Sequence, residues 1–252
     1  MPSRRQFITE VTFTPDVRQW KRIARRARKN GLSAIYWWVV ARDGAGVESS
    51  SEVRTLIKLH ENVRTTIFWV GEAASADNGF IPNDDSAWDE CWKERYGGID
   101  DPFDRDGFLP SAFAPADNPF YVALPYNDLD RNGEHKRNVL KTVPWAQEPI
   151  SPDESVVKNR WVKIIHDGHV CYGQWEDVGP FRENDRSSVF RGRELKRRAG
   201  LDVSPALATC LNIPFDVTPT SWRFVDEGKV PAGPWRDIVT TSQLNFDPPS
   251  CP

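Results

Sequence analysis

The clearest alternation of apolar and polar positions lies between residues 161 and 178. From Trp161 to His166, successive side chains alternate with a period of two, which indicates a strand with one buried face. Asp167-Gly168 follows, and this pair tolerates the positive φ angles that a tight hairpin turn requires. A return strand over 170–178 then ends at Gly179-Pro180. We therefore predict a β-hairpin that carries Asp177 at its far end.

A second strand pattern further along the chain also ends on a carboxylate. Leu201-Asp202-Val203 has the pattern of a strand end. Ser204-Pro205 follows, and these residue types are preferred at a helix N-cap and at the first helical position. We therefore predict a short helix over 206–211. The connector between the two patterns, residues 181–198, is rich in basic side chains.

The remaining strand patterns are separated by long polar segments. β-Branched and aromatic residues indicate a strand over 65–72, and we expect the last two strands at 222–225 and 235–241. Residues 73–119 are rich in Asp, Asn, Gly, Pro and aromatic residues. Long segments of this kind inside a compact domain are usually functional loops, so we predict an insertion here with a short helix at 86–96.

These patterns divide the chain into three parts. We predict a β-barrel domain with inserted loops over 63–245, preceded by an N-terminal extension over 1–62 and followed by a tail over 246–252. The extension is expected to contain a small amount of helix, including one over 49–60 that the serines at 49–51 would cap.

The first forty residues allow two interpretations. The basic run Lys21–Lys29, followed by the mostly apolar stretch Leu32–Ala41, resembles a secretory signal with a long leader. The stretch is too short to span a bilayer. Alternatively, residues 15–30 form a basic amphipathic helix, and residues 34–40 form a buried strand behind it.

Composition narrows the class of protein. A chain of 252 residues can bury a sizeable core, and a formal charge of −3 gives no global electrostatic reason to bind nucleic acid. The four cysteines, Cys91, Cys171, Cys210 and Cys251, lack any CxxC metal spacing. An exported protein would pair some of them, whereas a cytosolic one would keep buried thiols.

Two motifs resemble those of the double-psi β-barrel superfamily. EDVGPF at 176–181 and GLDVSPA at 200–206 are similar to motifs of the rare-lipoprotein-A-like group. Expansins and family 45 glycoside hydrolases use the same barrel, with an aspartate at the position matching Asp202. The resemblance implies a mainly β fold with a six-stranded double-psi β-barrel and long loop insertions. The sequence departs from the pattern at Val178, where an arginine is usual, and in its long basic connector.

The resemblance also suggests further site residues. Glu72 lies close to the first catalytic carboxylate of family 45 hydrolases, with an offset of two residues. Residues 118–128 resemble the segment that opens the second half of the barrel in the rare-lipoprotein group. That group has a functional histidine here, which this sequence lacks. Tyr126, Asn127 and Asp128 are the polar groups that remain at this rim.

Carboxylates at strand ends suit the chemistry of glycosidic bonds. In a glycosidase one carboxylic acid protonates the leaving oxygen, and a second acts as nucleophile or activates water. A lytic transglycosylase needs one acid/base, because a substrate hydroxyl attacks. The candidate catalytic residues are Asp202, Asp177 and Glu72, and close carboxylates would push their pKa values apart. From the residues alone, Asp202 could instead cap the following helix, and Asp177 could bind backbone amides of the Gly-Pro turn.

Aromatic side chains could bind the sugar rings of a substrate. Trp69 and Trp175 are candidates, although most of the eleven tryptophans are expected in the core. A period of two would place Trp175 and Asp177 on the same face. Tyr126 and Asp128 complete the expected substrate-binding set.

We expect neither a metal nor a cofactor. The spacing of Asp100, Asp101, Asp104 and Asp106 invites a calcium interpretation, but the central Gly and terminal Glu of an EF-hand loop are missing. We therefore expect a solvated acidic loop there. The glycines do not form a phosphate-binding loop.

The combined prediction is a carbohydrate-active enzyme that cleaves a β-linked polysaccharide, either peptidoglycan or a cellulose-like plant-type glucan. An expansin-like module that binds and loosens polysaccharide without cleaving it is the alternative, and a purely structural barrel is a third possibility. We expect a secreted or periplasmic monomer without a stable membrane span and without a nucleic-acid partner. A folded helix and strand at the N-terminus would instead favour the cytoplasm.

Overall fold

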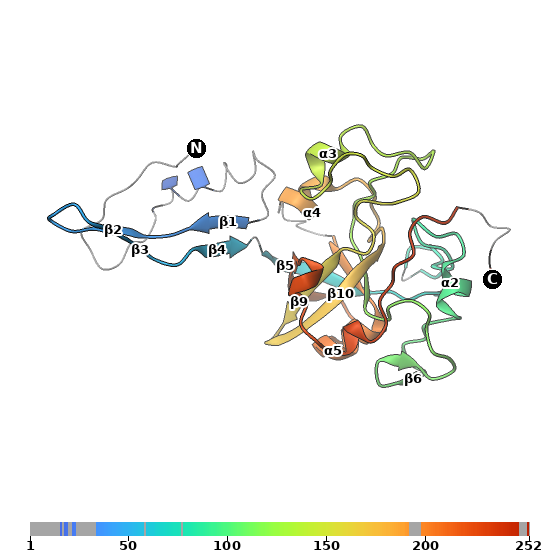
Figure 1. The fold of residues 1–252 in the computed structure, drawn as a ribbon. Coiled ribbons are helices and arrows are strands. Elements are labelled where there is room, and N and C mark those ends of the chain that lie inside the picture. The colour runs from blue at the N-terminus through green and yellow to red at the C-terminus, as the bar shows by residue number, and fades with distance from the viewer. Residues whose placement is uncertain are drawn as a thin grey trace. The chain divides into compact units, whose positions relative to one another are not determined.

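The computed structural model describes residues 16, 18–19, 22–23, 34–57, 59–76, 78–191, 198–246 and 251. Contacts divide the chain into two units, Met1–Ile57 and Lys58–Pro252, which Figure 1 draws as ribbons. The second unit starts slightly before the predicted domain over 63–245, because its first strand already begins at His60.

The first unit consists of two antiparallel pairs of short strands. β1 (Ala34–Trp37) pairs with β4 (Arg54–Ile57), and β2 (Val40–Arg42) pairs with β3 (Glu48–Ser50). The predicted helix over 49–60 is therefore wrong, because β1 and β2 offer partners for the backbone groups of these residues. Most of the predicted helix over 15–30 lies outside the described residues.

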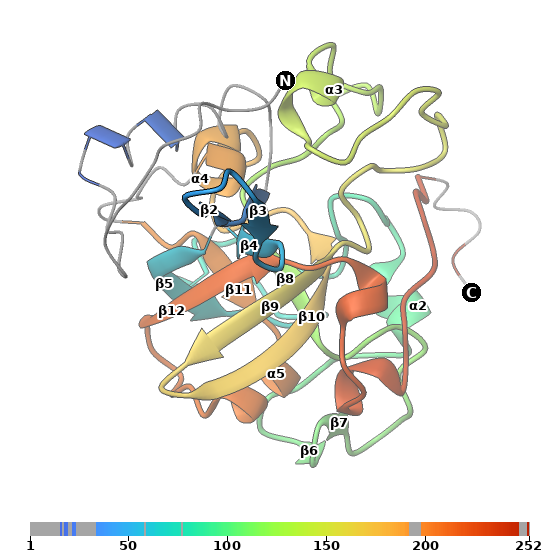
Figure 2. The same cartoon turned by 60° about the vertical axis from the view of Figure 1, so that its left-hand side comes forward.

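The second unit contains a closed barrel of six strands in the order β10-β8-β11-β5-β12-β9. The strands are β5 (His60–Ile67), β8 (Tyr121–Ala123), β9 (Trp161–His166), β10 (His169–Asp177), β11 (Leu201–Val203) and β12 (Thr218–Phe224). The pairs β10–β8 and β11–β5 are parallel, and the other four are antiparallel. Figure 2 shows β9 and β10 side by side as a hairpin. A mainly β protein with a six-stranded mixed barrel is thus confirmed.

The turn and cap residues correctly predicted the hairpin and the helix that follows Asp202. His166 pairs with His169 across a turn in which Asp167 and Gly168 both have positive φ. Helix α5 (Pro205–Leu211) begins where the Ser204 hydroxyl accepts a hydrogen bond from the Leu207 backbone N–H at 3.2 Å.

One predicted strand is absent from the barrel. Residues 235–241 form part of the 3₁₀ turn η2 (Pro234–Arg236) and an irregular segment, and β12 alone closes the sheet between β5 and β9. The Trp235 ring instead packs on Tyr172, with ring centroids 5.0 Å apart. A tertiary contact on the outside of the hairpin has replaced the expected strand.

The main core fills the barrel and the space beneath α5. Its buried members include Val122, Trp161, Ile164, Trp175, Leu201, Val203, Leu207, Leu211 and Trp222. Gly173 lets α5 approach β10 closely, because a Cβ atom there would lie 2.8 Å from the Leu207 side chain. A disulfide between Cys171 and Cys210 joins the same two elements.

Loops between the strands carry the remaining short elements. These are α2 (Trp92–Tyr96), β6 (Arg105–Asp106), β7 (Leu109–Pro110), α3 (Val139–Thr142), α4 (Arg186–Arg191) and η1 (Glu227–Lys229). The helix predicted over 86–96 is thus limited to its last turn, α2. A small second core, with Phe68, Val70 and Trp92 around Tyr121, holds the insertion that contains α2. Among the described residues, no helix has the length and apolar character needed to cross a bilayer.

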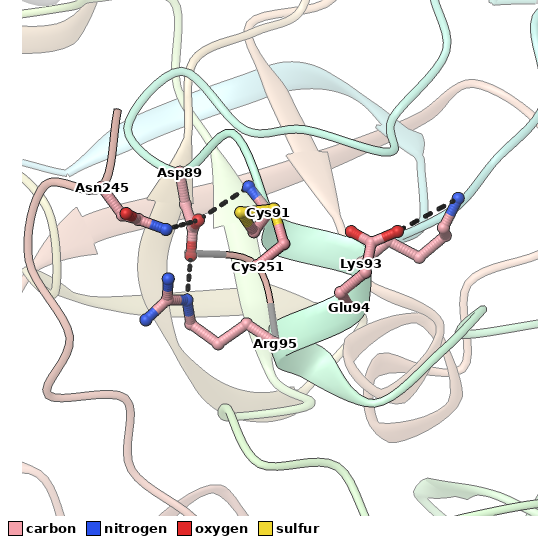
Figure 3. The surroundings of a disulfide bond; sticks show 7 residues. All are labelled: Asp89, Cys91, Lys93, Glu94, Arg95, Asn245 and Cys251. Atoms are coloured by element: carbon pink, nitrogen blue, oxygen red, sulfur yellow. Dashed lines mark hydrogen bonds and ion pairs between the residues drawn. A yellow bond between two sulfur atoms is a disulfide. The ribbon is translucent and has the colours of Figure 1, made fainter. Parts of the chain in front are cut away.

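A second disulfide connects this insertion to the C-terminal segment. Cys91, at the start of α2, is bonded to Cys251 (Figure 3). Asp89 lies beside it and accepts hydrogen bonds from the Cys91 backbone N–H and the Asn245 side chain. All four cysteines are therefore paired, and the alternative of buried thiols is wrong.

Candidate active site

Asp177 and Asp202 come together because their strands share a neighbour. In the barrel, Ala123 of β8 pairs with Asp177 of β10 on one side and with Asp202 of β11 on the other. Paired residues of neighbouring strands project to the same face of a sheet. The two aspartates therefore flank Ala123 on one face of the sheet, one strand to either side.

Asp202 lies partly buried between a strand and a turn. Its Oδ1 accepts a short hydrogen bond from the hydroxyl of Thr66, its partner in the parallel pair with β5. A Cβ atom at Gly179 would lie 3.5 Å from Oδ2. The turn after β10 therefore passes directly beside this carboxyl group.

Asp177 is fixed by the insertion. Its Oδ1 accepts a hydrogen bond from the Ala87 backbone N–H at 2.8 Å. Burial raises the pKa of Asp177 to about 6, and hydrogen bonds from the backbone of Ala87 and Val178 oppose the rise. This oxygen binds a backbone amide, but the amide belongs to the insertion and not to the Gly-Pro turn that the sequence suggested.

Glu72 is the third carboxyl group of the site. It follows β5 and is 8% exposed, and its Oε2 accepts a hydrogen bond from the Asn83 side chain at 2.9 Å. Backbone bonds Gly71 N–H to Asn83 C=O and Asn83 N–H to Glu72 C=O close this loop at its base. Glu72 is therefore held in place by the loop that it begins.

Electrostatics couples the three carboxyl groups. Burial raises the pKa of Asp202 to about 7, the Thr66 hydroxyl opposes the rise, and the charges of Asp177 and Glu72 add to it. The charges of Asp177 and Glu72 thus both act on Asp202, and we call these three residues the carboxylate cluster. A carboxyl group with such a pKa can still donate a proton near neutral pH.

A buried ion pair lies directly next to this cluster in the sequence. The Glu176 Oε2 is 2.6 Å from the Lys158 Nζ, and both side chains are almost fully buried. Burial raises the pKa of Glu176 to about 7, although Lys158 opposes the rise. No pattern in the sequence predicted this pair.

The predicted placement of Trp175 needs correction. The β10–β8 register shifts at Glu176, so that Trp175 pairs with Val122 and Asp177 pairs with the adjacent Ala123. A bulge of this kind breaks the period of two, and Trp175 and Asp177 project to opposite faces. Trp175 is fully buried in the core and offers no face to a ligand in this structure.

Tyr126 and Asp128 are also not at an exposed rim. Asp128 is fully buried, and it accepts hydrogen bonds from the Ser155 hydroxyl at 2.7 Å and the Val156 N–H at 2.8 Å. The buried Tyr126 ring packs edge-on against Phe190. Both side chains therefore hold neighbouring loops in place.

Trp69 remains compatible with the expected role in substrate binding. It is partly exposed, and its carbonyl accepts a hydrogen bond from the Glu72 backbone N–H. It therefore lies on the same turn as one member of the carboxylate cluster.

The acidic loop over 100–106 is only partly solvated, as Asp100 shows. Asp100 is fully buried, forms an ion pair with Arg105 and accepts a hydrogen bond from the Tyr121 hydroxyl at 2.8 Å. In the part of the chain that the structure describes, no group of His, Cys, Asp and Glu side chains is arranged to hold a metal ion.

Two hollows on the surface are lined by residues outside the carboxylate cluster. One of about 220 Å³ is lined by residues that include Trp145, Lys158 and Arg160, and one of about 600 Å³ by His135 and residues 148–150. None of the three cluster residues lines either hollow.

The neighbours that set the properties of the cluster could not be recognised from the sequence. Thr66, Ala87 and Gly179 each contact a carboxyl group, but they come from β5, the insertion and the turn after β10. Only the parallel pairing of β11 with β5 brings Thr66 to Asp202. A single strand pattern carries no signal for such a contact.

Comparisons with protein-family models, with curated proteins and with solved structures give no match for this chain.

Proposed function

We propose that this chain is a carbohydrate-active barrel protein that cleaves a β-linked polysaccharide by acid/base catalysis. The observation that carries the proposal is that Asp177 and Asp202 lie on one face of the barrel, on either side of Ala123, where burial and the charges of Asp177 and Glu72 raise the pKa of Asp202 to about 7. A glycosidic bond breaks when an acid protonates its leaving oxygen. An acid with this pKa keeps enough protonated form for that step near neutral pH.

We also infer that the barrel has the double-psi topology of rare-lipoprotein-A-like proteins, expansins and family 45 hydrolases. The mixture of parallel and antiparallel pairs in a closed barrel of six strands supports this inference. The two motifs that carry the resemblance lie at the end of β10 and across β11 into α5. They meet at Ala123 of β8.

Each member of the carboxylate cluster has a separate role in the proposed reaction. Asp202 gives its proton to the glycosidic oxygen as the bond to the anomeric carbon breaks. Water adds to that carbon, and Glu72 accepts the proton that the water loses. Asp177 is a positioning residue whose charge raises the pKa of Asp202. In a lytic variant of the reaction a substrate hydroxyl replaces the water.

The two disulfides favour an oxidising compartment, because disulfides persist there and are rare in the cytosol. We therefore propose a secreted or periplasmic protein, acting as a monomer on peptidoglycan or a plant-type glucan. Acid/base catalysis by carboxyl groups needs no cofactor.

The test measures soluble sugar released from purified peptidoglycan and from amorphous cellulose, together with the protein bound in the same tubes. We expect product from the wild type and a loss of at least 100-fold in Asp202→Asn, because the amide cannot donate the proton. Asp177→Asn is expected to be less severely impaired.

Asp167→Asn is the matched control, because Asp167 is exposed in the hairpin turn and asparagine tolerates its positive φ. It should release product like the wild type. Binding without product from any of these proteins would contradict the enzyme and favour the expansin-like alternative. Neither binding nor product would favour a structural barrel.

A further inference from the structure

Two exposed phenylalanines lie on the loops that leave the carboxylate cluster. Phe80 is 73% exposed and lies on the loop that Glu72 begins. Phe181 is 60% exposed and lies just past the end of β10, where Asp177 is located. Single exposed apolar residues are common, but apolar side chains exposed close together often mark a binding site.

The two loops meet beside Asp202. The Phe181 Cε1 lies 3.6 Å from the position of a Cβ atom at Gly79, the residue before Phe80. Gly179, two residues before Phe181, lies against the Asp202 Oδ2. The two loops that carry the rings therefore contact one another close to the proposed acid.

Both phenylalanines have an unfavourable backbone conformation. Phe80 and Phe181 have φ values of 61° and 58°, which bulky side chains rarely adopt. The Phe80 N–H donates to the Ser75 carbonyl at 2.7 Å, and the Asn127 N–H donates to the carbonyl of Glu183, two residues after Phe181, at 2.8 Å. Such strain persists only where the surroundings enforce it, and it is common at ligand-binding sites.

Aromatic rings next to carboxyl groups suit a carbohydrate ligand. One face of a pyranose ring carries C–H groups that an aromatic ring can cover, and the hydroxyls at its edge bind carboxylates. We propose that Phe80 and Phe181 form the aromatic subsite that binds a sugar ring of the polysaccharide next to Asp202. This inference rests on the proposed function, and it gives these two residues the role expected of Trp175.

The test uses variants that remove the ring and keep the backbone. Phe80→Asn and Phe181→Asn are suitable, because asparagine adopts positive φ more readily than phenylalanine does. Each is made in the Asp202→Asn background, so that binding to peptidoglycan and cellulose is measured without turnover. We expect about tenfold weaker binding for each variant, with an unchanged or higher unfolding midpoint.

Phe215→Asn is the matched control, because Phe215 is 54% exposed and lies beyond the C-terminal end of α5. Phe181→Tyr keeps an aromatic ring and should bind the polysaccharide as the parent protein does. Unchanged binding in both Phe80→Asn and Phe181→Asn would overturn the subsite. The proposed function would still hold if the wild-type protein, which keeps Asp202, releases product. If the parent protein neither binds nor releases sugar from either polysaccharide, both proposals fail together.

Discussion

Two carboxyl groups of the barrel, Glu176 and Asp202, have the same raised pKa of about 7 in very different surroundings. Glu176 is sealed against Lys158 in a buried ion pair. Asp202 is only partly buried and has the Thr66 hydroxyl as a neutral hydrogen-bond partner. The negative charges of Asp177 and Glu72 raise its pKa further. The difference teaches that a raised pKa alone does not indicate chemistry. The partner and the access of the group decide between a structural and a catalytic role.

The largest effect should come from breaking the ion pair. Lys158→Met leaves Glu176 buried without its cation, so we expect the free energy of unfolding to fall by about 3 kcal/mol. Urea denaturation at pH 7 measures this change. Lys229→Met is the control, because its pair with Asp226 is exposed and should contribute less than about 1 kcal/mol. A loss for Lys158→Met no larger than the control would show that the buried pair is dispensable.

Asp202→Asn should have the opposite, smaller effect on stability. The folded pKa of Asp202 lies above its unfolded value, so the native state binds the extra proton between about pH 4 and pH 7 and loses stability as the pH rises through this window. The asparagine side chain of the variant does not titrate, so the variant does not lose stability in this way. Relative to the wild type, we expect the variant to gain about 2 kcal/mol between pH 4 and pH 8, allowing for partial exposure.

Urea denaturation of both proteins at the two pH values gives this difference directly. Since all other titrating groups are shared, only Asp202 and its immediate neighbours contribute. A pH-independent difference between wild type and variant would mean that Asp202 titrates normally in the folded protein.

The smallest effects are shifts in the pKa of Asp202 itself. Thr66→Val removes the hydrogen bond that stabilises the charged form, so the pKa should rise. Glu72→Gln removes a negative charge and should lower it. The two variants must shift the titration in opposite directions, as followed by the NMR signal of the ¹³C-labelled Asp202 carboxyl. Shifts of the same sign would contradict the described cluster.

Elements specified by local residue chemistry could be predicted from the sequence. The Asp167-Gly168 turn fixes the hairpin, and Ser204 caps α5 through its own side chain. The end of β10 could therefore be assigned to Asp177, whereas Asp202 is the middle residue of β11, one position before that strand ends. That they meet on either side of Ala123 depends on the order of strands in the closed barrel, for which the sequence offered only a resemblance.

Features that depend on distant partners were missed. The bulge at Glu176 reverses the face of Asp177 relative to Trp175, and it exists only in the pairing with β8. Asp128 looked like an accessible carboxylate, but Ser155 from another loop binds it in the interior. Period and composition describe one segment at a time, whereas these contacts join segments far apart in the sequence.

The most direct test of the central claim is the NMR titration of the Asp202 carboxyl group in the wild-type protein. The described environment predicts a midpoint of about 7, with the protonated acid still present at neutral pH. A midpoint near 4, the value of an ordinary aspartate, would mean that Asp202 is fully ionised and cannot serve as the proton donor.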